Sequence, residues 1–257
     1  ILKLMKASLA LRERLMQMAS ENLDTVMPAS TWSQHAQPTT FAHYAMSWEL
    51  PLENDFERLQ QLYDRVNRSP AGAAIMTGSR YPIKRERTAE LLGFDGTITN
   101  TRYAVLGFDG WLGVPAEAYT VPSLLMMNVS GIASELYTWS TTEFSYVELA
   151  DRYCGTSSIM PQKKNPYTLM WVRGAAARTY GHLASYLYEM HDVCMGYVRQ
   201  LGTTLDDVLE ATEIMTGVLA TLSINKERML ENATNMNWIC ATDLADLIVL
   251  EKGLPFR

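Results

Sequence analysis

Residues 118–139 read AYTVPSLLMMNVSGIASELYTW, and apolar side chains recur along them in steps of three and four. The stripe consists of Ala118, Val121, Leu125, Val129, Ile132, Leu136 and Trp139. Because three- and four-residue steps return to the same side of an α-helix, this stretch predicts a long helix with one continuous apolar face.

Stripes of the same kind cover residues 4–18, 169–190 and 201–222, and no segment shows sustained alternation of period two. Several long amphipathic helices without strands are typical of helical bundles, so we predict an all-α fold built as an elongated bundle. Each helix carries so much apolar surface that we expect the bundle to continue across subunits.

Helix-breaking residues divide the rest of the chain. A helix expected over residues 39–66 contains Pro51, which removes one backbone donor and should kink it. Glycines and prolines between residues 69 and 100 predict an irregular crossover with one short helix at about 87–92. A further short helix is expected near the end of the chain, with Thr242 as its N-cap and Gly253 as its stop.

Composition excludes several classes of function. The net charge is −6 and no run is rich in Lys and Arg, so nothing favours nucleic-acid binding. The odd set of Cys154, Cys194 and Cys240 lacks a Cys-x-x-Cys pair, which favours reduced thiols in a cytoplasm and indicates no metal site. No apolar run approaches the roughly 20 residues that span a bilayer, and we expect neither a signal peptide nor a membrane anchor.

Residues 155–166 read GTSSIMPQKKNP and have the character of an active-site loop. Small residues at 155–158 allow the backbone to turn successive N–H groups toward one point. Lys163 and Lys164 add positive charge, and no carboxylate is expected near either. Such a loop suits the binding of an oxyanion.

This run resembles the signature of the fumarase/aspartase superfamily, Gly-Ser-Ser-x-Met-Pro-x-Lys-x-Asn-Pro, and its Gln-Lys-Lys form is similar to the argininosuccinate lyase branch. Thr156 stands where the family has a glycine. The resemblance extends over DTVMP at 24–28, AQP at 36–38, RERTAELLGFD at 85–95, ATDLAD at 241–246 and KGLPFR at 252–257.

The resemblance also implies a domain organisation. Residues 1–240 correspond to the central helical-bundle domain of the family, with the crossover at 69–100 and a mobile signature loop at 151–166. Residues 241–257 correspond to the start of a C-terminal helical domain, and the family's N-terminal domain is absent from this chain. The family further implies a homotetramer in which each active site takes residues from three chains.

Family members remove a proton from the carbon beside a carboxylate and then expel an amine or hydroxide, leaving fumarate, with no cofactor and no metal. The carbanion requires preorganised N–H donors and a cation facing the adjacent carboxylate. The resemblance assigns the general base to Ser157, the first serine of the pair. Lys163 is then the cation, while Ser158 and Asn165 bind the substrate.

A second cluster, residues 31–38, resembles the family's Thr-His-Leu-Gln-x-Ala-Gln-Pro. Thr31 and Gln34 are retained and are expected to bind a substrate carboxylate. The family histidine is Trp32 here, and the glutamate that usually pairs with it is Met170. His35 is one possible substitute, although we expect it to face elsewhere than Trp32, whose expected role is packing against substrate or loop.

A third set concerns the leaving amine. Tyr197 and Arg199 are retained as substrate-binding residues, whereas Gly202, Leu205 and Tyr167 replace the family's glutamine, lysine and aspartate. The predicted reaction is therefore β-elimination from an N-substituted aspartate or argininosuccinate-like dicarboxylate, and argininosuccinate itself is placed in doubt. Two alternatives stay open: a carboxymuconate-type cycloisomerase adapted to Trp32, and an inactive crystallin-like structural protein.

Overall fold

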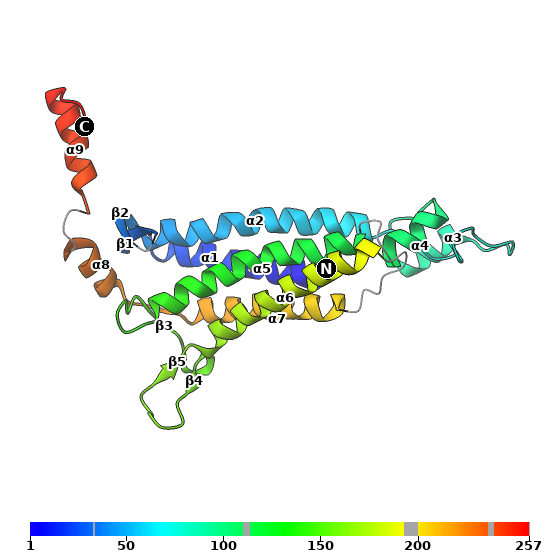
Figure 1. The fold of residues 1–257 in the computed structure, drawn as a ribbon. Coiled ribbons are helices and arrows are strands. Elements are labelled where there is room, and N and C mark those ends of the chain that lie inside the picture. The colour runs from blue at the N-terminus through cyan, green and yellow to red at the C-terminus, as the bar shows by residue number, and fades with distance from the viewer. Residues whose placement is uncertain (33, 110–113, 193–199, 236–238, 257) are drawn as a thin grey trace.

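The structure is a computed structural model that describes residues 1–32, 34–109, 114–192, 200–235 and 239–256. Its body is an elongated bundle of long helices lying side by side (Figure 1). These helices are α1 (Leu2–Ser20), α2 (Phe41–Val66), α5 (Val114–Trp139), α6 (Tyr167–Asp192) and α7 (Leu201–Ala220). The predicted all-α bundle is confirmed.

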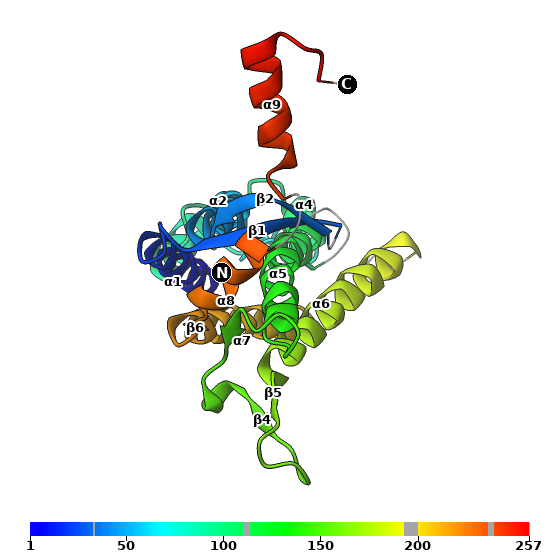
Figure 2. The ribbon, with the colours of Figure 1, turned by 90° about the vertical axis from the view of Figure 1, so that its left-hand side faces the viewer.

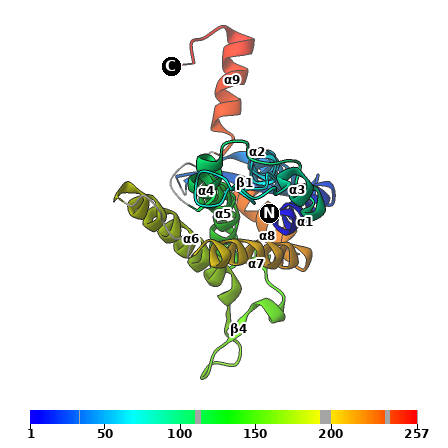
Figure 3. The same cartoon turned by 90° about the vertical axis from the view of Figure 1, so that its right-hand side faces the viewer.

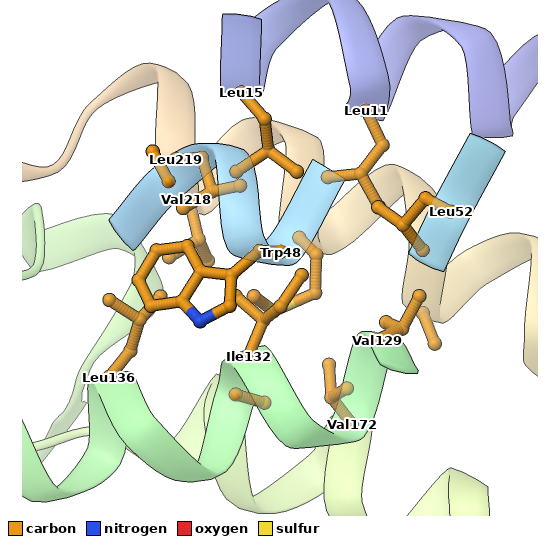
Figure 4. Close-up of a cluster of buried hydrophobic side chains, with 14 of the residues drawn as sticks. Leu11, Leu15, Trp48, Leu52, Val129, Ile132, Leu136, Val172, Val218 and Leu219 are labelled. Atoms are coloured by element: carbon orange, nitrogen blue, oxygen red, sulfur yellow. The ribbon is translucent and has the colours of Figure 1, made fainter. Parts of the chain in front are cut away.

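The predicted stripes form the core of this bundle. Leu11 and Leu15 from α1, Leu52 from α2 and Leu136 from α5 are completely buried. They meet Val172 of α6 and Val218 of α7 in the same cluster (Figure 4). The helices therefore bury the apolar faces that the three- and four-residue spacing predicted.

The outer half of α6 departs from its predicted stripe. Leu169, Val172 and Ala176 are buried, but further along the stripe Tyr180 is 38% exposed and Leu187 is 54% exposed, although the neighbouring Tyr186 is buried. Figures 2 and 3 show why: α6 crosses the bundle at an angle and its C-terminal half extends away from the other helices.

A β-hairpin at one end of the bundle was not expected. Strand β1 (Val26–Thr31) pairs antiparallel with β2 (Gln34–Thr40), from Val26 opposite Thr40 to Thr31 opposite Gln34. Neither strand alternates regularly between buried and exposed residues, and a register shift lies between Pro28 and Ser30. The hairpin thus lacks the period-two signal on which its recognition in the sequence would depend.

Residues 67–100 form the crossover at the opposite end (Figure 1). Ser69 fixes its base, donating its N–H to Gly96 O at 2.8 Å and accepting from the N–H of Ile98 at 3.0 Å. The short helix α3 (Arg85–Leu92) matches the prediction and ends at Gly93, whose φ of 78° is readily available only to glycine. Helix α4 (Thr101–Asp109) follows and was not predicted.

Beyond α7, the chain forms α8 (Lys226–Asn235), which packs against β1, and α9 (Ala241–Lys252), which stands away from the bundle (Figures 1 and 3). Helix α9 ends at Gly253 as predicted, with φ 64°. The predicted N-cap was wrong, because the helix begins one residue before Thr242 and its N-cap is Cys240, which makes no side-chain capping bond.

Candidate active site

The signature segment folds as a second β-hairpin, which projects from the side of the bundle (Figures 1 and 2). Its strands are β4 (Gly155–Thr156) and β5 (Lys164–Asn165), with Gly155 opposite Asn165 and Thr156 opposite Lys164. Helix α6 begins two residues after β5, so the hairpin is joined directly to a helix of the core.

Ser157 lies at the start of the hairpin tip, and its hydroxyl oxygen accepts two backbone hydrogen bonds. The N–H of Met160 donates to Ser157 Oγ at 3.0 Å and the N–H of Ile159 donates at 3.3 Å. Hydrogen bonds donated to an oxygen favour its negatively charged form. The tip therefore directs two backbone donors at Ser157 Oγ, and the side chain remains partly exposed.

The two lysines of the hairpin have different surroundings. Lys164 Nζ donates to Glu148 Oε1 and pairs with Asp151 Oδ1, each at 2.7 Å, and donates to Leu149 O at 3.1 Å. The hydrogen bonds to Asp151 and Glu148 raise the pKa of Lys164 above its usual value. The expectation that no carboxylate lies near either lysine is wrong for Lys164.

Lys163, by contrast, forms no ion pair with any residue that the structure describes, and its side chain is exposed. It lines a cavity of about 570 Å³ between the hairpin and the C-terminal end of α5. That lining also includes Tyr137, Thr141, Glu148 and Lys164, but neither Ser157 nor Asn165. Within one chain, Ser157 and Lys163 share the hairpin tip without facing one closed cavity.

The second predicted cluster lies elsewhere. Thr31 and Gln34 face each other at the tip of the β1–β2 hairpin, and both are exposed. Figures 1 and 2 show the two hairpins on opposite sides of the same end of the bundle. A single chain therefore does not bring Thr31 and Gln34 together with Ser157.

Most of the substituted positions are exposed, whereas Leu205 is partly buried against the core. Trp32 is 98% exposed and has a φ of 54°, so its side chain does not pack within the chain. Met170, in the first turn of α6, is 47% exposed. Gly202 and Leu205 lie in the first turns of α7, far along the bundle from the signature hairpin (Figure 1). Tyr197 and Arg199 fall outside the described residues.

Reasoning from the sequence missed the partners of Lys164. Glu148 belongs to β3 (Val147–Glu148), which pairs with β6 (Ser223–Ile224), and Asp151 opens the short 3-10 helix η1 (Asp151–Tyr153). The two acidic residues lie 16 and 13 positions before Lys164. Only the pairing of β4 with β5 brings them to the lysine, so local spacing gave no signal.

No group of three or more His, Cys, Asp or Glu side chains suited to a metal ion occurs in the described part of the chain. None of the helices that the structure describes combines the length and apolar character needed to cross a membrane.

Comparisons with known proteins agree with this architecture. A family model described as lyase matches residues 1–181. The chain is 43% identical to argininosuccinate lyase of Methanococcoides burtonii, over 100% of this chain and 53% of that protein. It is 39% identical to the enzyme of the same name from Geobacillus thermodenitrificans, over 96% of this chain and 54% of the relative.

Among solved structures, a variant of EDDS lyase with bound fumarate matches with a TM-score of 0.91 and 37% identity, covering 100% of this chain and 51% of that one. A class II fumarase from Schistosoma mansoni shares the fold alone, with a TM-score of 0.82 and 13% identity. The chain spans about half the length of the curated relatives it matches. With the helical bundle, the signature hairpin and these matches together, the chain belongs to the argininosuccinate lyase-like lyases of the fumarase/aspartase superfamily.

Proposed function

We propose that this chain forms the central part of a carbon–nitrogen lyase, which releases an amine from an N-substituted aspartate or argininosuccinate-like dicarboxylate and leaves fumarate. The observation that carries the proposal is the tip of the signature hairpin, where Ser157 Oγ accepts two backbone N–H bonds and Lys163 has no ion-pair partner among the described residues. An oxygen prepared for charge and an unpaired cation are the groups that proton abstraction beside a carboxylate requires.

The reaction proceeds by β-elimination. Ser157 accepts the proton from the carbon next to one carboxylate, and the electron pair spreads onto that carboxylate. Lys163 and the amide of Asn165 stabilise the resulting double negative charge. The electron pair on the carbon then forms the C=C bond of fumarate while the C–N bond breaks, and its electrons go to the protonated, cationic nitrogen of the substrate, which leaves as a neutral amine.

The remaining site residues complete this proposal. Thr31 and Gln34 bind a substrate carboxylate, with Ser158, Tyr197 and Arg199 as further substrate-binding residues. Since one chain separates the two hairpins, the site closes when different chains of a homotetramer contribute them. Such an assembly, acting in the cytoplasm on a small-molecule dicarboxylate, fits both hairpins having exposed tips.

Replacing Ser157 tests the proposal. In the complete gene product that contains the chain, a panel of N-substituted aspartates and argininosuccinate should yield fumarate, measured by its ultraviolet absorbance. Ser157→Ala should lower kcat by at least about 100-fold, because general base catalysis contributes about that much or more. Ser20→Ala, at an exposed serine of α1, serves as the control and should keep the wild-type rate.

If Ser157→Ala has an unchanged rate, Ser157 is not the general base.

Assays of the wild-type protein also distinguish the alternative functions. Lactone formation from carboxymuconate without fumarate release would favour a cycloisomerase, in keeping with the exposed Trp32. No turnover of any substrate would favour a structural protein.

A further inference from the structure

The base of the signature hairpin is tied to the bundle, whereas its tip is not. Thr168 Oγ1 donates to Tyr153 O at 2.6 Å, joining α6 to the segment before β4. Lys164 joins β5 to Glu148 and Asp151. In the described part of the chain, no polar side chain of residues 157–163 makes a hydrogen bond or ion pair outside the tip. The tip thus depends on its base for its position.

All the donors of Lys164 are occupied at this base. An ammonium group has three N–H donors. Glu148, Asp151 and the carbonyl of Leu149 supply three acceptors within 3.1 Å of Nζ. Two carboxylates also outweigh the single positive charge, so Lys164 has neither a free donor nor net charge to offer a carboxylate substrate.

We propose that Lys164 is a positioning residue: it clamps the base of the hairpin so that Ser157 and Lys163 reach the substrate, without touching the substrate itself. This inference rests on the proposed roles of Ser157 and Lys163. The two adjacent lysines then have different roles. Lys164 binds carboxylates of its own chain, and Lys163, which has no ion pair among the described residues, binds the carboxylate of the substrate.

The expected effect on catalysis follows from geometry. Catalytic groups that move by about 1 Å can lose about 100-fold in rate. Without the clamp, the tip spends less time in the productive position, which affects the chemical step more than substrate binding. We therefore expect Lys164→Met to lower kcat about tenfold or more and to change KM about twofold or less. Lys164→Arg keeps the charge and several donors and should recover most of kcat.

The clamp has a second readout that does not depend on activity. Backbone hydrogen exchange over residues 155–165 should be about threefold faster in Lys164→Met than in the wild type, because exposed ion pairs contribute modestly to local stability. Added salt should accelerate exchange in the wild type but not in Lys164→Met. Lys226→Met, at an exposed lysine of α8 with no ion pair among the described residues, should change neither exchange nor kcat.

The outcomes are distinguishable. If the wild type turns over no substrate, the proposed function fails, and unchanged exchange in Lys164→Met would overturn the clamp as well. If Lys164→Met loses kcat with unchanged exchange, Lys164 acts on the substrate directly and the positioning role is wrong. Faster exchange with wild-type kcat and KM would show a purely structural ion pair, which also overturns the proposal.

Discussion

Tyr44 and Trp48 of α2 both donate hydrogen bonds to the carboxylate of Glu135 on α5. Tyr44 Oη donates at 3.2 Å to Oε1, and Trp48 Nε1 donates to Oε2. Burial, followed by the negative charge and the hydrogen bond of Glu135, raises the pKa of Tyr44 to about 12. The neutral phenol is therefore favoured in the folded chain.

This arrangement predicts a pH dependence. A tyrosine ionises near pH 10 in the unfolded chain. The stability that the raised pKa of Tyr44 supplies is present below pH 10 and is lost as the pH rises toward about 12. Urea unfolding at pH 8 and at pH 11 should show a smaller alkaline loss in Tyr44→Phe than in the wild type, by about 1 kcal/mol after allowance for solvent screening. Equal losses in both proteins would contradict this role.

The sequence identifies some residues of the candidate site but not others. Ser157, Lys163 and Asn165 were proposed because the short motif that contains them resembles the signature of the fumarase/aspartase superfamily. The partners of Lys164 could not be predicted from the sequence. Glu148 and Asp151 approach the lysine only when β4 pairs with β5. The roles of Ser157 and Lys163 stay predictions until variants are measured.

Among the elements, α7 and η1 fit together at Gly217. A Cβ atom added there would lie 2.0 Å from Tyr153 Oη and 3.0 Å from its Cζ. These distances are shorter than non-bonded contacts allow, so a side chain at position 217 must displace the Tyr153 ring. That ring precedes β4 by two residues, which makes Gly217 a determinant of where the hairpin begins.

Gly217→Ala should therefore destabilise the chain by about 1–3 kcal/mol, even though alanine is the better helix former. Thermal unfolding measures the loss, and hydrogen exchange over residues 155–165 should accelerate with it. Gly181→Ala is the matched control, because nothing lies within 4 Å of a Cβ at that helical glycine. Adding Tyr153→Phe should recover part of the stability. Equal effects of the two glycine substitutions would refute the contact.

The long helices and the short strands differed in how far the sequence predicted them. Long helices such as α5 were predicted because their stripes repeat over many turns. The β1–β2 hairpin was missed because its strands do not alternate, and β4 and β5 have two residues each, too few for any period. Short strands are defined by their partners rather than by their own pattern.

At the scale of the whole molecule, one core connects the long helices. Leu15 is completely buried in it, while the next residue, Met16, is 45% exposed. Leu15→Ala should lower the free energy of unfolding by about 2–5 kcal/mol, the usual cost of an apolar cavity. Met16→Ala should change it by about 0.5 kcal/mol or less. Urea titrations followed by tryptophan fluorescence and by circular dichroism should give the same loss, since both report the same core.

The fold class was predictable from one chain, but the complete site was not. Apolar stripes predicted which helix faces are buried within the bundle. They did not distinguish Val172 and Ala176 of α6, which are buried, from Leu187 of the same stripe, which is 54% exposed, because spacing alone does not show which part of a helix face is covered.

The strand pairing of Gly155 with Asn165 has an evolutionary consequence. Because the segment between them leaves and re-enters the bundle at neighbouring backbone positions, a replacement segment of different length could join the same two ends. For the proposed reaction such a replacement must keep Ser157 and Lys163, whereas the exposed residues 158–162 between them can change without repacking any helix beneath.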